Sequence, residues 1–326
     1  MEIHHFEHGW VTPAVSYALS VLGSLLGLVC AVRLRSARTG GGRAWWLTLS
    51  AIAIGGTGIW TMHFVAMLGF GVVGTPIRYD VALTAASAIL AIAAVGAGMM
   101  IVFGGERARA ARIVAGGLLA GLGVAAMHYM GMYAMHLNGH ISYGTTRVAA
   151  SVAIAVVAAT VALWLTVTVQ KPLAILGAAL IMGVAVNGMH FTGMSAMTVR
   201  AGELTGTPTG ATATALLIPI GLAVVFGVLG LVYALMAAPT DEDRAAAAYL
   251  AARLEQGGAG ARLEQGGAGA RPERTDAAAA SRPAPAAGTP TGTAGGTPTG
   301  AARIPRQRGS ALGGASWTYR DRSSRQ

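Results

Sequence analysis

Seven long apolar runs divide most of the chain into segments that are each long enough to cross a membrane. A hydrocarbon core about 30 Å thick requires about 20 apolar residues of helix, and short polar or basic linkers separate the runs. Buried strands are much shorter, so the pattern predicts an all-α integral membrane fold with seven transmembrane helices. The predicted helices span residues 12–34, 44–70, 81–103, 113–135, 148–169, 172–199 and 213–237.

Basic residues alternate between the linkers in a way that predicts how the helices are oriented. Lys and Arg are retained on the cytoplasmic side of a membrane protein. We therefore expect residues 1–11 outside the cell and the C-terminus in the cytoplasm. The first, third and fifth linkers carry Arg33, Arg35, Arg38, Arg43, Arg107, Arg109, Arg112 and Lys171, and the second, fourth and sixth carry Arg78, Arg147 and Arg200.

A short phrase recurs three times near the ends of the second, fourth and sixth predicted helices. The copies read TMHFVAMLGF, AMHYMGMYAM and GMHFTGMSAM, and their histidines are His63, His128 and His190. They share the order methionine, histidine, aromatic, any residue, small residue, methionine. A phrase that returns at a nearly constant interval indicates a structural repeat. We therefore predict three two-helix repeats, with the seventh helix as a cap.

The three histidines are predicted to lie at one level of the membrane. With a rise of about 1.5 Å per residue, they lie roughly 27, 23 and 27 Å above the cytoplasmic starts of their helices. That height corresponds to the outer third of the hydrocarbon core. Because an ionisable side chain is costly in lipid, three of them at one depth indicate a single functional site built from three helices.

Methionines accompany these histidines at fixed spacings, one directly before each histidine and one four residues after it, where it shares the histidine's helix face. Imidazole and thioether form a soft, neutral ligand set that suits copper, whereas Mg²⁺ and Ca²⁺ require oxygen ligands. The predicted helices lack the carboxylates of an iron site, and a single cysteine, Cys30, cannot supply the thiolates of a structural zinc site. We therefore predict a copper site whose candidate ligands are His63, His128, His190, Met62, Met127, Met189, Met67, Met132 and Met194.

Two other side chains and one simpler explanation stay open at this point. Asn187 precedes His190 by one turn, where it either orients that imidazole or forms a hydrogen bond between helices. Tyr129 is an aromatic residue of the phrase that has a polar atom to offer. Histidines in a membrane also form hydrogen bonds across helices, and methionine is a common apolar filler.

The composition changes after residue 238, which divides the chain into residues 1–11, a membrane domain of residues 12–238 and a tail of residues 239–326. The tail is rich in Ala, Gly, Pro and Thr, and residues 252–260 are copied at residues 261–269. Such sequence cannot bury enough apolar surface to fold, so we expect a mostly disordered tail with a short helix at residues 240–254. The net charge of +10 comes with no basic helix interleaved with aromatics, so we expect no binding to nucleic acid.

The phrases, the two-helix period and the seven predicted helices resemble the bacterial MHYT-domain family over roughly residues 10–238. The resemblance implies an integral membrane sensor domain of the bacterial cytoplasmic membrane. It implies copper bound near the outer face and a response to oxygen, carbon monoxide or nitric oxide. No copy reads Met-His-Tyr-Thr, and because phenylalanine cannot bind a metal, only Tyr129 retains an aromatic ligand. The positions carried over are Met62, His63, Phe64, Met127, His128, Tyr129, Met189, His190 and Phe191.

Many members of that family also carry domains that make or degrade cyclic dinucleotides, or kinases. The tail shows no catalytic pattern, so we expect no enzyme activity and a separate cytoplasmic signalling partner. The other partners expected are membrane lipids and a small diatomic ligand. A haem-binding membrane protein is one alternative, although two axial histidines would leave the third unused. A copper transporter or metallochaperone is the other.

Overall fold

The computed structural model describes residues 3–4, 9–201, 208–238, 243 and 245–256. Seven of the described helices are long and apolar enough to cross a membrane, which confirms the predicted number. The chain is therefore a multi-pass membrane protein with seven candidate spans. Their bounds are Val11–Ser36 (α1), Gly40–Met67 (α2, η1 and α3), Val81–Phe103 (α4), Arg109–Tyr133 (α5), Thr145–Thr168 (α6), Pro172–Ser195 (α7) and Ala213–Ala237 (α8).

The second span is one continuous helix with an unusual centre. It begins as α2 (Gly40–Ala51), widens into the π-helical segment η1 (Ile52–Thr61) and ends as α3 (Met62–Met67). Gly23 of α1 allows η1 to approach closely, because a Cβ on Gly23 would lie 2.3 Å from the Gly58 nitrogen. Extended π-helix is rare and often occurs at functional sites, and here it leads directly into the first phrase.

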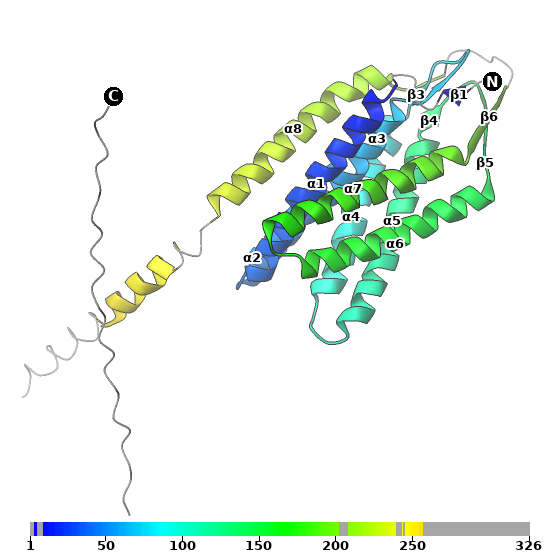
Figure 1. Cartoon of the computed structure of the whole chain (residues 1–326). Coiled ribbons are helices and arrows are strands. Elements are labelled where there is room, and N and C mark those ends of the chain that lie inside the picture. The colour runs from blue at the N-terminus through cyan, green and yellow to red at the C-terminus, as the bar shows by residue number, and fades with distance from the viewer. Residues whose placement is uncertain (1–2, 5–8, 202–207, 239–242, 244, 257–326) are drawn as a thin grey trace, which may run out of the picture. The chain divides into compact units, whose positions relative to one another are not determined.

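A short antiparallel β-ribbon closes each two-helix repeat. One strand precedes the first helix of the repeat, and its partner follows the second helix. All three ribbons lie at the same end of the bundle, which we call the ribbon end (Figure 1). The order strand, helix, helix, strand thus occurs three times, as the predicted two-helix repeats require. The pairs are β1 (Ile3–His4) with β2 (Gly71–Val72), β3 (Arg78–Tyr79) with β4 (Met135–His136), and β5 (Gly139–Tyr143) with β6 (Met197–Ala201).

The apolar pattern did not predict these ribbons, and it placed the ends of three helices too late. The second span ends at Met67 and the fourth at Tyr133, not at residues 70 and 135. The sixth span was expected to reach residue 199, but α7 ends at Ser195 and β6 begins at Met197. Alternate residues of β6, Met197 and Val199, remain apolar because the ribbon end has a buried core of its own that includes them. Apolar periodicity therefore continues through a change from helix to strand.

The six helices of the three repeats form a closed ring. Each packs against its neighbours in chain order, and α7 returns to contact α1. The seventh helix, α8, lies outside this ring against α1 and η1, which fits its predicted role as a cap. Leu231 of α8 packs in an apolar cluster with Leu26 and Cys30 of α1.

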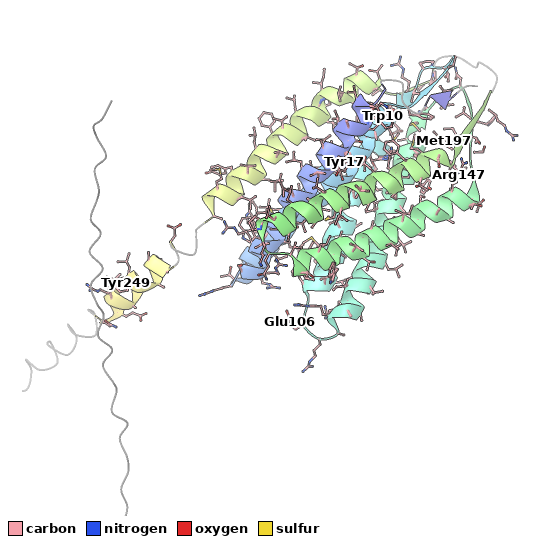
Figure 2. The ribbon with its side chains drawn as sticks, in the orientation of Figure 1. Trp10, Tyr17, Glu106, Arg147, Met197 and Tyr249 are labelled. Carbon is pink, nitrogen blue, oxygen red and sulfur yellow. The ribbon has the colours of Figure 1, made fainter. Side chains whose placement is uncertain are left out.

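Arginine side chains cap the C-terminal ends of helices inside the bundle. Arg35 donates to two backbone carbonyls at the end of α6, and Arg112 donates to one at the end of α4. Arg147 lies at the ribbon end, whereas Glu106 lies at the other end of the bundle (Figure 2). The Arg147 side chain donates a hydrogen bond to the last backbone carbonyl of α7. Carbonyls in the last turn have no helical partner and carry partial negative charge. The basic residues that predict the orientation therefore also stabilise the helix ends.

The predicted terminal segments fall largely outside the described residues. In the N-terminal segment, residues 1–2 and 5–8 lie outside them, and in the tail, residues 239–242, 244 and 257–326 do. Residues 245–256 are helical, close to the predicted short helix. This helix does not continue α8, because Ala238 has an extended backbone that ends α8.

Replacing Gly121 by alanine is expected to destabilise the bundle, because the new Cβ would lie 2.5 Å from the Val156 Cα on α6. Backbone atoms cannot yield as a flexible side chain does, so we expect a loss of roughly 2 kcal/mol. Gly227→Ala on α8 is the matched control, since a Cβ there meets nothing within 4 Å. Thermal unfolding in detergent measures both, and equal midpoints for the two variants would contradict the predicted contact.

Candidate metal centre

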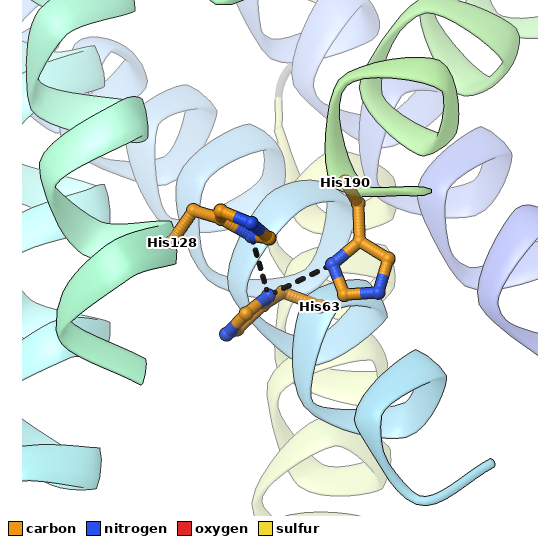
Figure 3. Close-up of side chains that lie close together, drawn as sticks. All are labelled: His63, His128 and His190. Carbon is orange, nitrogen blue, oxygen red and sulfur yellow. Dashed lines mark hydrogen bonds between the residues drawn. The ribbon is translucent and has the colours of Figure 1, made fainter. Parts of the chain in front are cut away.

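Three imidazoles, one from each repeat, meet inside the ring (Figure 3). His63 lies on α3, His128 on α5 and His190 on α7, each about one turn before its helix ends. The Nδ1 atom of His63 is 3.0 Å from the Nδ1 of His190 and 3.1 Å from the Nδ1 of His128. One ring nitrogen from each histidine lies within 4.8 Å of the other two. The structure thus brings together, at one level, the three histidines that the sequence predicts to share a site.

The cluster is buried, and its hydrogen bonding is incomplete. His63, His128 and His190 are 3%, 0% and 1% exposed, and the Nε2 of each has no hydrogen-bond partner among the described residues. Each neutral imidazole has one N–H and one lone pair, and an unpaired buried polar atom costs about 1–3 kcal/mol. A metal ion bound by the three inward-facing nitrogens would engage their lone pairs.

The spacing of the Nδ1 atoms is close to what a metal ion requires. Metal–nitrogen bonds of about 2.0–2.1 Å in trigonal or tetrahedral geometry hold the nitrogens roughly 3.3–3.6 Å apart. The two shortest distances here are 3.0 and 3.1 Å. Along these two contacts the rings therefore need to separate by only a few tenths of an ångström to hold an ion. Three protein ligands would leave one tetrahedral position for another ligand.

A small residue three positions after each histidine makes room for an imidazole of a different repeat. A Cβ on Gly131 would lie 2.3 Å from the Nε2 of His63, and a Cβ on Gly193 would lie 2.3 Å from the Nε2 of His128. Ala66 occupies the corresponding position in the first repeat. These contacts hold the outer edge of each ring against a neighbouring helix, so that Nδ1 faces the centre. The small residue of the repeated phrase was the sequence signal for this role, which sequence reasoning did not assign.

The six candidate methionines are all buried. Of those that precede a histidine, Met127 and Met189 pack in the large cluster that fills the ring, and Met62 is fully buried. Those that follow a histidine by four residues pack at the ribbon end, in what we call the ribbon-end cluster, and they are Met67, Met132 and Met194. Binding of a metal by the sulfur atoms of the six methionines stays a prediction.

The two other predicted site residues make hydrogen bonds away from the imidazoles. The hydroxyl of Tyr129 is 2.6 Å from the Ser151 hydroxyl on α6. Asn187 accepts a hydrogen bond from Ser16 on α1 and donates one to a backbone carbonyl of its own helix. Asn187 therefore links two helices, which is one of its two predicted roles. The Tyr129 ring nevertheless packs edge-on against the His128 ring, with centroids 5.0 Å apart.

The ribbon-end cluster covers the histidines at that end of the bundle. Besides its methionines it contains Phe70, Val72 and Leu216, together with Tyr79 of β3. Tyr79 is 2% exposed, and burial raises the pKa of its phenol above the usual value. Because the members of this cluster are buried, the three histidines stay nearly unexposed at that end.

The sequence matches three copies of the repeat MHYT, described as the N-terminal repeat of bacterial signalling proteins, over residues 56–116, 121–179 and 183–251. Each match contains one of the three phrases and the helix that follows it. The matched repeat thus groups each phrase with the next helix, whereas the β-ribbons group it with the preceding one. Both descriptions have the same two-helix period.

Curated relatives share the membrane domain at about one third identity. The bifunctional diguanylate cyclase/cyclic di-GMP phosphodiesterase MucR of Pseudomonas aeruginosa is 37% identical over 205 residues, 61% of this chain and 29% of its own length. An uncharacterized signaling protein of Caulobacter vibrioides is 34% identical over 195 residues, which are 59% of this chain and 23% of its own length. The cyclic di-GMP phosphodiesterase NbdA of Pseudomonas aeruginosa is 36% identical over 162 residues, which are 47% of this chain and 20% of its own length. The chain thus spans less than a third of the length of these relatives, and no solved structure matches it.

Replacing Gly131 or Gly193 by alanine is expected to weaken metal binding about 10- to 100-fold, the range seen when groups that orient a ligand are lost. The added methyl group would displace the His63 or His128 ring. Titration with Cu(I) against a chromogenic chelator measures the affinity. Gly188→Ala on α7 is the control, because a Cβ there has open space. Wild-type affinity in both test variants would show that these glycines do not position the rings.

Proposed function

The chain belongs to the MHYT family of bacterial membrane signalling domains, and from that premise we propose that it is a sensor of a diatomic gas. We infer that copper is held by His63, His128 and His190 and that the gas is oxygen, carbon monoxide or nitric oxide. The observation that carries this proposal is the convergence of three imidazole nitrogens, one from each repeat, in a buried site.

The donor set supports copper as the bound metal. Three neutral imidazoles suit copper, zinc, iron or nickel, and thioether sulfur favours Cu(I) among these. The methionines of the ribbon-end cluster lie one helical turn beyond the histidines and are the candidates for a further ligand. Bound copper would supply a soft centre with a position at which O₂, CO or NO binds. The protein's own contribution is to hold three rings in place and to exclude water.

The origin of the ligands supports a signalling role. Each imidazole belongs to a different repeat, so a change in the spacing of the three Nδ1 atoms moves three helices relative to one another. The helix of His63 also continues from η1, and π-helical segments are frequent at functional sites. We propose that this movement is passed to a cytoplasmic partner and that the chain is not itself an enzyme. Two of the relatives are enzymes of cyclic di-GMP, which suggests a partner that makes or degrades this dinucleotide.

The packing of the imidazoles favours a compact ion over haem. A haem iron with two histidine ligands needs them on opposite faces of a wide planar ring. Here the ring centroids are 4.8–5.1 Å apart, and the Nδ1 atoms face one another directly. A transporter would need ligands spread along a path, whereas these three lie at one level. The arrangement therefore supports a fixed metal site.

Single replacement of His63, His128 or His190 by alanine is expected to abolish the binding of about one copper ion per chain, because two imidazoles hold the ion far less tightly. His140→Ala, at an exposed position of β5, is the control and should retain copper. Metal analysis and an optical spectrum of the purified chain provide the measurement. A Soret band would establish haem and refute the copper site. Copper uptake into proteoliposomes would favour a transporter.

The ribbon end is expected to face outwards from the bacterial cytoplasmic membrane, because the opposite end carries most of the basic linker residues. Cys30 is fully buried and should not react, so new cysteines can report on the topology. A membrane-impermeant maleimide should label His140→Cys in intact cells and Arg107→Cys only after permeabilisation. The reverse labelling pattern would contradict this orientation.

A further inference from the structure

A groove between α6 and α7 opens on the side of the bundle away from the ring centre. It has a volume of about 380 Å³, and its described lining consists of alanine, valine, isoleucine and methionine. Val157 and Ile181 on its walls are exposed, as residues in contact with lipid are. Both residues lie near the middle of their helices. The groove therefore opens toward the centre of the hydrocarbon core.

Behind the groove lies a small cavity inside the ring, with a volume of about 40 Å³. Ala158 of α6 and Met182 and Ala185 of α7 line both spaces, so these three residues form the neck between them. The described wall of the cavity is apolar except for Ser24. Its lining also includes Met189, the residue directly before His190. The two spaces thus follow one another from the lipid side of the bundle to Met189, next to His190 in the chain.

The size and lining of the cavity limit what can occupy it. A water molecule needs about 10–15 Å³ by the same measure, so this cavity has room for a diatomic molecule or a single atom of similar size. Water would find few hydrogen-bond partners on such a wall, and dry apolar cavities bind apolar gases instead. Small neutral gases also leave water readily for hydrocarbon. The bilayer centre is therefore where a buried site meets them at the highest concentration.

We propose that neutral diatomic gases reach the histidine site from the lipid, through the neck formed by Ala158, Met182 and Ala185. This inference rests on the proposed function and specifies how that same site receives its ligand. The buried side chains of the ribbon-end cluster cover the other approach, and Met189, which lines the cavity, directly precedes His190. An unbranched methionine adapts its shape easily. Anions such as azide and cyanide lack access, because the route offers them no charge or hydrogen bond.

Narrowing the neck tests the route in the full-length, Cu(I)-loaded chain in lipid nanodiscs. In Ala158→Leu and Ala185→Leu, the larger side chain fills the neck, and flash photolysis of bound CO should show association and dissociation rates about tenfold slower. The equilibrium constant should not change, since the neck does not touch the metal. Met182→Ala should accelerate both rates. Ala149→Leu and Ala174→Leu, exposed positions of α6 and α7 outside the groove, should keep wild-type rates.

Unchanged rates in both neck variants would overturn the route, and so would slowing that the exposed controls share. A second measurement does not depend on copper: xenon binding to the metal-free chain, followed by ¹²⁹Xe NMR. Saturable xenon binding in the wild type that is lost in Ala158→Leu and Ala185→Leu supports the route, even if CO does not bind. If CO does not bind, only the proposed gas sensing fails. No xenon binding in the wild type would reject the route even if CO does bind.

Discussion

Buried imidazoles in a membrane need partners, and here each repeat supplies one imidazole to a cluster that none of the repeats can form alone. His63 contacts both other histidines through Nδ1, so its position determines the level at which all three repeats meet. The closed ring of six helices and the three β-ribbons hold that level. Small residues at Gly131 and Gly193 then allow the rings to turn inwards. The arrangement of the other helices keeps three polar rings together in an apolar medium.

The threefold repetition of the chain gives a site that is not fully symmetric. His63 is central in the observed contacts, and its helix alone continues from a described π-helical segment. Its repeat also has Ala66 where the other two have glycine. A change at the metal would therefore act unequally on the three repeats. Such inequality gives α3 and η1 a distinct place in the proposed signalling, because a π-helical segment can return to α-helical pairing without unfolding.

The site combines isolation from water with access from lipid. Apolar side chains cover it at the ribbon end, whereas alanines between α6 and α7 leave small spaces on the membrane side. A soft metal centre protected in this way suits a neutral gas better than a charged metabolite. The same domain occurs in curated signalling proteins that are more than three times longer than the matched region. A compact membrane domain of this kind can serve different output proteins.

The number of helices, the two-helix repeat and the common depth of the histidines could all be predicted from the sequence, because apolar length and repeat spacing are local properties of a chain. The hydrogen-bond and packing partners of each side chain could not be predicted in this way. Asn187 turns to Ser16, and Tyr129 turns to Ser151, because the rotation of each helix depends on neighbours in other repeats. The six methionines look equivalent in the sequence, yet Met127 and Met189 pack in the ring, whereas Met67, Met132 and Met194 pack in the ribbon-end cluster. Which nitrogens face one another was decided only by packing between residues 65 and 127 positions apart.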